Sequence, residues 1–467
     1  MLLTTRKPDH IYKFLVLSVK HNIEKKLNLN KTELIFFKLF KFPSLKYLFF
    51  LIFLLLSGKL FSKNRANIKY KETLIGKFIL AQTFQNFKAY ISIYDFYKTL
   101  IKNFIKAGIY IRSAEYYVSK KKIKALYVDH CGGLNGILYS YFSNKKIIIY
   151  TNMYPSNIYG VDFRKNNKNH LKNFQDSIKV SKKAALNLNQ KRKTKKLLKK
   201  LFIKPNYLDW MSQTKYKKHD KIKYNNFDYI VYAHSFTDDQ LCYGFDGFEN
   251  TLDWLNFTLD KLGSLNKKII IKGHPNFYSK SLGILSIWDK KIFSKNKEKY
   301  IKNKNFYFID KPIFNNDLLK KVDKKTILIS HHGTVLFEGA QLGFKSICSE
   351  ATMFSNNFKI SNFWTDKKNY ENLLNLRYEK LNYPNKIDLD FLIYTMFTSD
   401  YSYSGKYFWQ NIIAKEIGIK SMIDWNNKIE IFSNTKNADK RRLYFKKMIN
   451  GKEDKIISKI SKNIGFI

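Results

Sequence analysis

The sequence predicts an α/β protein of two doubly wound domains that face a cleft, with a helical N-terminal extension and a helical C-terminal tail. Three observations predict this class. Short apolar strands alternate with helical stretches in both halves of the chain, an order that is typical of parallel sheets. The length of 467 residues suits two cores better than one. Hydrophobic residues make up 45% and aromatic residues 16% of the chain, which is ample for two cores.

Residues 1–60 are expected to form the basic, apolar and helical extension. Its most apolar run is "YLFFLIFLLL", residues 47–56, which is about half as long as a bilayer-spanning helix. The run begins too far from the N-terminus for a signal peptide. Two roles stay open for it: peripheral contact with an anionic membrane, aided by flanking lysines, or burial in the first domain.

Residues 61–225 are predicted to form the first α/β domain. A strand at 125–128, a glycine turn with a helix, and a strand at 147–150 follow one another, which indicates a parallel sheet. Asp129 and His130 come directly after the first of these strands. They are candidates for a general base, although the segment could equally serve as a turn that positions the glycines after it.

Residues 226–395 repeat the alternation more clearly and are predicted to form the second α/β domain. The tail, residues 396–467, is expected to be mostly helical and to pack back on the first domain. The five strands expected in the second domain lie in "FDYIVYAHSF", "KKIIIKGHPNF", "NFYFID", "KKTILIS" and "FKSICS".

Polar side chains gather where these strands end, and ligands of doubly wound sheets bind at that edge. We therefore take the strand-end residues as site candidates. They are His234, Ser235, Asp238 and Asp239 after one strand, Lys272 and His274 after the next, and Ser330, His331, His332, Gly333 and Thr334 after a third.

The stretch "SHHGTVLFE" has the features of a phosphate-binding corner. Gly333 allows a close approach of the backbone, and Thr334 can cap the following helix, whose N–H groups and dipole suit an anion. Glu338 lies one turn further on the same face, where its carboxylate can accept hydrogen bonds from ribose hydroxyls. His274, which precedes a proline, can donate to a phosphate. These residues predict a nucleotide or phosphate-ligand site.

Other chemistries are disfavoured. His331 and His332 are adjacent and are expected to point apart, so that they would not share an ion. The chain has no HExxH, CxxC, P-loop, GxGxxG or GxSxG motif, so we expect no metal, no cofactor and no serine hydrolase. Its three cysteines, Cys131, Cys242 and Cys348, are expected to be buried thiols in a reducing, cytoplasmic compartment.

The charge balance points to polyanions without specifying one. Lysine and arginine number 85 against 37 acids, for a net charge of +48. Only eight of these cations are arginines, the side chain that is preferred for recognising phosphates and bases. We therefore expect a solvated lysine surface and no nucleic-acid partner. A non-catalytic, basic nucleic-acid-binding protein remains the alternative of another class.

Two segments, "IIIKGHPNF" and "ILISHHGTVLFEGAQLGFKSICSE", resemble the carboxyl-terminal half of bacterial capsule polysaccharide biosynthesis glycosyltransferases. These are GT-B enzymes that include Kdo transferases and, more distantly, polysialyltransferases. "AHSFTDDQLCYGFDGFENTLDWLNFTLDKL" is similar to the segment that opens their nucleotide-binding domain. The resemblance covers roughly residues 227–350.

The resemblance implies two Rossmann-type domains, of which residues 61–225 would be the acceptor-side domain and residues 226–395 the nucleotide-sugar-binding domain. It also implies metal-independent transfer of a sugar to a capsule, lipopolysaccharide or other surface glycan. A CMP-activated acidic sugar such as Kdo or sialic acid would be the donor. His274 would contact its phosphate, Ser330 and Thr334 would lie beside that phosphate, and Glu338 would hold the ribose. Such an enzyme would work in the cytoplasm or on the inner face of the membrane.

The chain departs from the family in the first domain, where the acidic-acidic-glycine motif of polysialyltransferases is absent. The nearest acid is Asp129, which we take as the base, with His130 as second candidate. A neighbouring alternative is a CDP-polyol phosphotransferase of the teichoic-acid type.

Overall fold

The structure is a computed structural model, and it describes most of the chain outside 162–186, 196–225 and 398–449. The described segments are 1–4, 12–26, 33–121, 123–128, 132–145, 147–153, 157–161, 226–238, 244–278, 283–352, 358–397, 450–462 and 465–466, with isolated positions between them.

The second domain is built on a six-stranded sheet in which every described pairing is parallel. Its order is β10-β9-β8-β11-β12-β13, which in chain order reads 3-2-1-4-5-6, that of the doubly wound dinucleotide-binding fold. The predicted α/β class is therefore confirmed, and β13 adds a sixth strand to the five expected. The strands are β8 (Tyr229–Tyr232), β9 (Ile269–Lys272), β10 (Phe306–Ile309), β11 (Ile327–Ser330), β12 (Ser346–Ser349) and β13 (Asn362–Trp364).

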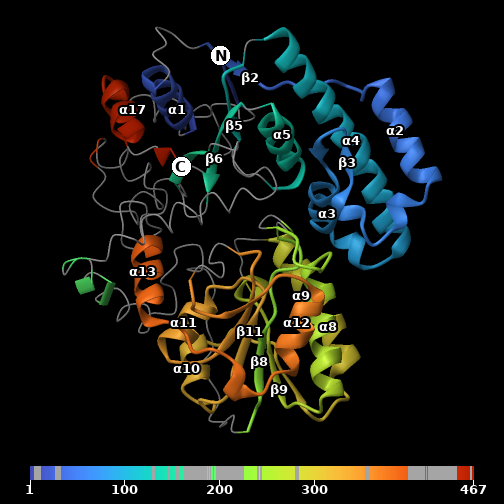
Figure 1. The fold of residues 1–467 in the computed structure, drawn as a ribbon, viewed down its shortest axis with the longest axis vertical. Coiled ribbons are helices and arrows are strands. Elements are labelled where there is room, and N and C mark those ends of the chain that lie inside the picture. The colour runs from blue at the N-terminus through green and yellow to red at the C-terminus, as the bar shows by residue number, and fades with distance from the viewer. Residues whose placement is uncertain are drawn as a thin grey trace.

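Helices cover both faces of this sheet (Figure 1). Alternate strand residues such as Val231 and Ile271 pack with α8, α9 and α12, whereas Ile230 and Ile270 pack with α10 and the start of α11. Strands buried on both faces read as continuous apolar runs, which is why their sequences show no alternation. The helices are α8 (Thr251–Ser264), α9 (Ile284–Tyr300), α10 (Asn315–Leu319), α11 (Val335–Gln341), α12 (Lys367–Asn375) and α13 (Lys386–Phe397).

The first domain has a sheet in the order β14-β7-β6-β5-β1-β2. Four neighbouring strands, β2, β1, β5 and β6, are parallel, whereas β7 runs antiparallel to β6. Their order of 2-1-3-4 along the chain is that of the flavodoxin-like doubly wound sheet. The strands are β1 (Leu2–Thr4), β2 (Leu34–Phe36), β5 (Ala125–Val128), β6 (Ile148–Met153), β7 (Asn157–Val161) and β14 (Gly465–Phe466).

The boundary predicted at residue 60 does not match this sheet. β1 lies between β2 and β5 and pairs with both, so the N-terminal residues belong to the first domain rather than to an extension. Helix α2 (Leu45–Leu56) also buries one face in the first core, through Tyr47, Leu51 and Leu54. A strand of three residues is too short to show a periodic pattern, so its place depends on neighbours distant in the chain.

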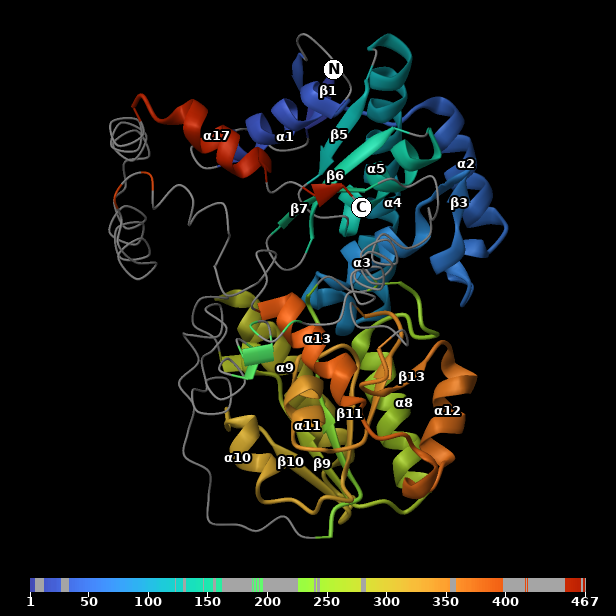
Figure 2. The same cartoon turned by 60° about the vertical axis from the view of Figure 1, so that its left-hand side comes forward.

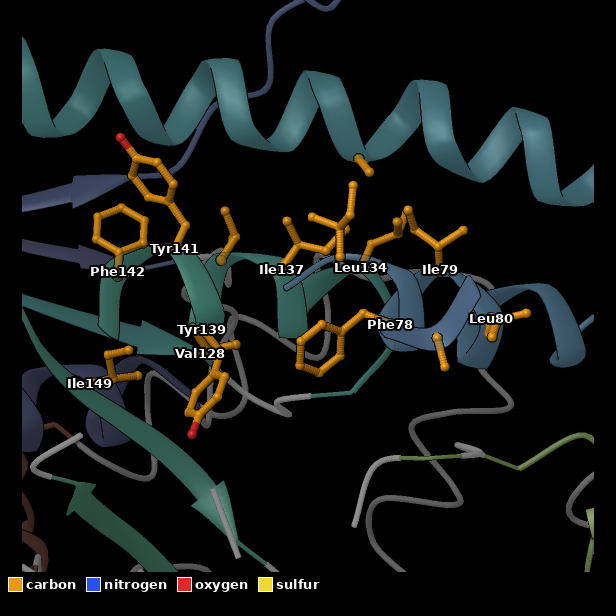
Figure 3. Close-up of a cluster of buried hydrophobic side chains, with 14 of the residues drawn as sticks. Phe78, Ile79, Leu80, Val128, Leu134, Ile137, Tyr139, Tyr141, Phe142 and Ile149 are labelled. Carbon is orange, nitrogen blue, oxygen red and sulfur yellow. The ribbon is translucent and has the colours of Figure 1, made fainter. Parts of the chain in front are cut away.

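The core of the first domain lies between the sheet and its helices (Figure 3). Phe78 and Ile79 come from α3, Leu134 and Ile137 from α5, and Val128 from β5, and all five side chains are buried. The long helix α4 begins where the Ser92 hydroxyl accepts the Asp95 N–H. The helices are α1 (Tyr12–Lys26), α3 (Gly76–Phe84), α4 (Ile93–Lys120) and α5 (Gly133–Asn144).

The described end of the chain lies against the first domain (Figure 2). Helix α17 (Glu453–Lys462) packs beside α1, and the Ser18 hydroxyl donates to the Ile457 carbonyl at 3.2 Å. β14 then pairs with β7. The short elements are β3 (Lys69–Tyr70), β4 (Thr73–Leu74) and the 3₁₀ helices η1 (Lys59–Phe61), η2 (Arg65–Asn67), η3 (Phe87–Tyr90), η5 (Pro275–Tyr278) and η7 (Tyr378–Lys380).

None of the helices within the described segments is both long enough and apolar enough to cross a bilayer.

Candidate functional site

Three predicted histidines from three separate strand ends converge at the centre of the second sheet. His234 follows β8, His274 follows β9 and His332 follows β11. The His234 ring centroid lies 3.9 Å from that of His332 and 5.1 Å from that of His274. β8 and β11 are the neighbouring strands between which the strand order reverses, and this switch point is where doubly wound sheets bind ligands.

The loop after β8 is held by a buried carboxylate that was not predicted. Asp289 of α9, which is 1% exposed, accepts hydrogen bonds from the Ser235 hydroxyl and from the N–H groups of Phe236 and Thr237. Burial raises the pKa of Asp289 to about 6, in spite of these donors. The predicted site residue Ser235 therefore has a structural partner, which fixes the backbone beside His234.

The two acids predicted in this loop differ in what the structure describes. Asp238 is exposed, and its carboxylate acts on His234: burial lowers the pKa of His234, whereas the charge of Asp238 raises it. Asp239 lies outside the described residues.

Lys272 and Glu338 form a second polar group near the strand ends. Lys272 is 3% exposed, and its ammonium lies 5.8 Å from the ring centroid of Tyr232, its register partner on β8. Burial lowers the pKa of Lys272 to about 8, while the nearby Glu338 carboxylate acts in the opposite direction. Glu338 accepts a hydrogen bond from Asn315 Nδ2 at 2.7 Å. The ribose partner predicted from the sequence is thus tied to α10 and lies close to a buried cation.

The backbone around His274 sets its tautomer. His274 Nδ1 accepts the Asn276 N–H at 3.1 Å, so in the neutral ring the proton is on Nε2. Burial, followed by the neighbouring His234 and Lys272, holds the pKa of His274 well below its ordinary value. His274 is therefore an uncharged imidazole at neutral pH, with its Nε2–H as a hydrogen-bond donor.

Ser330 closes the turn between β11 and α11 through a hydrogen bond to the backbone. The Ser330 hydroxyl accepts the Gly333 N–H at 3.1 Å, and a Cβ added at Gly333 would lie 2.7 Å from that oxygen. The predicted close approach at Gly333 is present for this reason. Thr334 occupies the N-cap position of α11, but its side chain makes no capping hydrogen bond. Its backbone is already helical, at φ −64° and ψ −15°, whereas a capping side chain needs an extended backbone.

His331 and His332 do not point apart, which corrects the expectation from their adjacency. Their Nδ1 atoms lie 2.6 Å apart, and His331 Nε2 lies 2.9 Å from Asp246 Oδ2. Asp246, also missed from the sequence, is 2% exposed in the loop before α8. Within the described segments, no group of three or more histidine, cysteine, aspartate or glutamate residues is arranged to hold a metal ion.

Asp246 is an ionised carboxylate. Burial alone would raise its pKa, but the adjacent His331 and hydrogen bonds from the Ser349 hydroxyl and the Phe248 N–H leave the pKa below its ordinary value. The Ser349 bond is 2.5 Å long. A charged group this deeply buried requires such partners, so Asp246 and His331 depend on each other.

The candidates of the first domain cannot be compared with this cluster, since Asp129 and His130 lie outside the described residues, as do Cys131 and Cys242. Cys348 is buried, as predicted. Beyond the two base candidates, α5 begins at Gly133 with φ +50°, and its next N–H, that of Leu134, reaches Gln82 Oε1 at 3.4 Å.

The first domain contacts the loops that carry the cluster. The Tyr90 hydroxyl donates to the Phe236 carbonyl at 2.6 Å. The ring of Phe87 stacks on that of Trp288 of α9, with centroids 5.7 Å apart. These contacts place η3 directly against the segment that positions His234.

The comparisons with known proteins are distant. No family model matches the chain, and no curated protein matches it. Among solved structures, it is similar to Thermosulfurimonas dismutans KpsC, a beta Kdo 2,4 transferase, at 9% identity and a TM-score of 0.35, over 59% of this chain and 80% of that one. It is also similar to Methanocaldococcus jannaschii UDP-GlcNAc 2-epimerase in complex with UDP-GlcNAc and UDP, at 13% identity and a TM-score of 0.26, over 84% of this chain and 97% of that one.

The chain's own topology defines its class: an α/β protein with two doubly wound, Rossmann-type domains. A histidine cluster at the switch point of the second sheet is its candidate site.

Proposed function

We propose that this protein is a glycosyltransferase that moves a sugar from a nucleotide-activated donor to a surface glycan. The observation that carries the proposal is the convergence of His234, His274 and His332 at the switch point of a 3-2-1-4-5-6 sheet. That edge is where such sheets bind nucleotides. A neutral His274 with its proton on Nε2 suits a phosphate oxygen that gains charge as the glycosidic bond breaks.

The remaining candidates take roles consistent with their positions. In this proposal, the Ser330–Gly333 turn lies along the phosphate, with Thr334 beside it. Glu338 accepts hydrogen bonds from the ribose. Asp129, or else His130, removes the proton from the acceptor hydroxyl.

The donor is proposed to be a CMP-activated acidic sugar such as Kdo or sialic acid, on the resemblance of the strand-end motifs. The acceptor is proposed to be a capsule, lipopolysaccharide or related glycan. No metal is required in this mechanism, because hydrogen-bond donors at the cluster stabilise the departing nucleotide.

The test is a panel of nucleotides screened by thermal shift, followed by a transfer assay. A ligand that binds only the native state raises the apparent stability, so CMP at 100 times its Kd would add about 2.7 kcal/mol. His274→Ala is expected to remove this shift and to lower transfer by about 10²-fold or more. His21→Ala, at an exposed histidine of α1, is the matched control.

Undiminished CMP binding and transfer in His274→Ala would refute the assignment of the site. The mass of the product separates two chemistries: a bare glycosyl gain supports sugar transfer, and a gain that includes phosphate supports a CDP-polyol phosphotransferase.

We also propose that the enzyme docks on an anionic membrane through the outer face of α2. This face carries five exposed apolar side chains: Leu45, Phe49, Ile52, Phe53 and Leu56, which are 73%, 69%, 49%, 54% and 85% exposed. Their spacing puts them on one side of the helix, opposite the buried face. α2 lies at the outer edge of the first domain (Figure 1).

The charge around α2 matches this partner. Between Glu33 and Glu72 the chain has eight lysines and arginines and no acid, and two of these cations form ion pairs, Arg65 with Glu249 and Lys71 with Glu115. An apolar stripe flanked by cations is the pattern of a helix that lies in the membrane interface. The sequence left two roles open for residues 47–56, burial in the first domain and contact with a membrane. In this proposal each face of α2 has one of them.

Phe49→Glu combined with Phe53→Glu tests the docking face. The double variant is expected to bind phosphatidylglycerol vesicles at least about tenfold more weakly in sedimentation, since it lacks two apolar side chains that the membrane would bury. Ile387→Glu, at a position that is 76% exposed on α13, should bind like the wild type. Deletion of residues 1–60 would be uninformative, because it removes β1. Light scattering that reveals a dimer dispersed by the double variant, without vesicle binding, would contradict the proposal.

A further inference from the structure

We propose that Asp246, His331 and His332 form a proton relay, through which His332 donates a hydrogen bond to the bound phosphate while the positive charge rests on His331. The inference rests on the proposed function, because it assumes a phosphate at the histidine cluster. Its geometric basis is one unbroken chain of contacts. Asp246 Oδ2 lies 2.9 Å from His331 Nε2, and His331 Nδ1 lies 2.6 Å from His332 Nδ1.

A 2.6 Å separation of two ring nitrogens requires one proton between them, since two lone pairs or two N–H groups would repel. Asp246, an ionised carboxylate, accepts the Nε2–H of His331. Two arrangements satisfy these conditions. In the first, both rings are neutral, His332 Nδ1–H donates to His331, and His332 Nε2 has a lone pair. In the second, His331 is an imidazolium that donates in both directions, and His332 carries its proton on Nε2.

The step from the first arrangement to the second balances as the uptake of one proton. A proton binds at His332 Nε2, and the proton on His332 Nδ1 moves to His331 Nδ1. No other bond changes. The added charge appears on His331, 2.9 Å from the Asp246 carboxylate, rather than on His332.

The surroundings explain why the charge should move. His332 faces His234, which follows β8, and is influenced by His274, which follows β9 next to the Lys272 ammonium. Burial and these neighbouring imidazoles, including His331, hold the pKa of His332 well below its ordinary value. A lone histidine in this position would resist protonation, whereas a relay lets it present an N–H without keeping the charge.

The middle member of the relay is held rigidly. The ring of His331 packs edge-on against Trp254 of α8 and Trp364 of β13, with centroids 5.4 Å and 5.8 Å away. Its carbonyl accepts the Ser349 N–H at 3.0 Å and faces the Cys348 thiol, 3.4 Å away. Asp246 and His331 are thus positioning residues, and His332 is the one that would meet the ligand.

The first experiment needs no ligand. Solid-state ¹⁵N NMR of histidine-labelled protein between pH 8.5 and 5.5, assigned with His331→Gln and His332→Gln, reports the tautomer of each ring. The relay predicts that His332 changes from the Nδ1–H to the Nε2–H form as His331 becomes doubly protonated. An unchanged His332 tautomer, or an imidazolium at His332 itself, would overturn it.

The second experiment is calorimetry of CMP binding at pH 7 in two buffers of different ionisation enthalpy. We expect an uptake close to one proton per CMP for the wild type and close to none for Asp246→Asn. Uptake of one proton changes the wild-type affinity about tenfold per pH unit, so the variant should bind at least about tenfold more weakly than the wild type at pH 6.5 and approach the wild-type value at pH 8.5. Asp388→Asn, at a buried carboxylate of α13, is the control and should keep the uptake.

CMP binding by the wild type without proton uptake would overturn the relay, whether or not Asp246→Asn folds. If CMP and the other nucleotides do not bind at all, the proposed function fails, and the NMR result still decides the relay.

Discussion

The two sheets of this protein are built from the chain in opposite ways. The second sheet uses one continuous stretch, from β8 to β13, and the helices α8, α9, α10 and α11 separate its first five strands. The first sheet gathers its strands from both ends: β1 lies in the first residues, β14 in the last, and β1 separates β2 from β5. The same kind of architecture is thus local in one half of the molecule and non-local in the other.

This difference matters for stability and for the site. In the second sheet, the strand ends that carry the histidines lie within one continuous segment of the chain, and their convergence follows from strand order. In the first sheet, the central strand has only three residues, and one of its two partners, β5, follows more than a hundred residues later. The first sheet should therefore be the easier one to break by a single substitution.

The largest effect is expected from Leu3→Ala in β1. Leu3 is fully buried in the first core, and removing a buried leucine side chain costs about 2 to 5 kcal/mol. Hydrogen exchange measured by mass spectrometry should show faster exchange in β2, β5 and β6 than in the wild type, with β8, β9 and β11 unchanged. Leu45→Ala, at a side chain that is 73% exposed, should stay within about 0.5 kcal/mol. Equal loss of protection in both sheets would mean that they unfold as one unit.

A pH effect of intermediate size should be confined to the second domain. The pKa of Asp289 is about 6 in the folded protein, above its ordinary value of 3.8, so between these pH values the native state binds more protons than the unfolded state. The free energy of unfolding should therefore decrease as the pH rises from about 4 to 6, by about 2 to 3 kcal/mol.

Asp289→Asn should flatten this dependence, and urea denaturation at several pH values measures it. Asp317→Asn, at an exposed residue of α10, should keep the wild-type slope. A wild-type stability that rises over this pH range would contradict the predicted direction.

The smallest effect concerns the contact between the two halves. Arg65 of η2 binds Glu249, ahead of α8, with its Nε and Nη2 atoms 2.8 Å and 3.2 Å from the two carboxylate oxygens. The side chains are 12% and 23% exposed, so the pair is only partly screened by solvent. A double-mutant cycle of Arg65→Ala and Glu249→Ala should give a coupling energy of about 1 kcal/mol. A coupling near zero would mean that this ion pair does not help to hold the halves together, whereas contacts such as Tyr90–Phe236 and Phe87–Trp288 still join them.

The sequence predicted the site residues that follow strand ends, but it did not predict the buried acids that hold them in place. His234, His274 and His332 could be predicted because an apolar run followed by a polar residue marks a strand end in the sequence itself. Asp246 and Asp289 could not, because their partners, His331 and Ser235, are distant in the chain. Each of these aspartates reads as an ordinary surface acid until tertiary structure buries it.

The sequence by itself determined the α/β class, the strands of the second domain and the strand-end histidines, because these depend on local apolar runs and on the rule for parallel strands. Tertiary structure alone decided the place of β1, the division of α2 into a buried and an exposed face, and the contact between His331 and His332. Each of these depends on which distant surfaces exclude water from a given side chain, and this is decided only when the chain has packed.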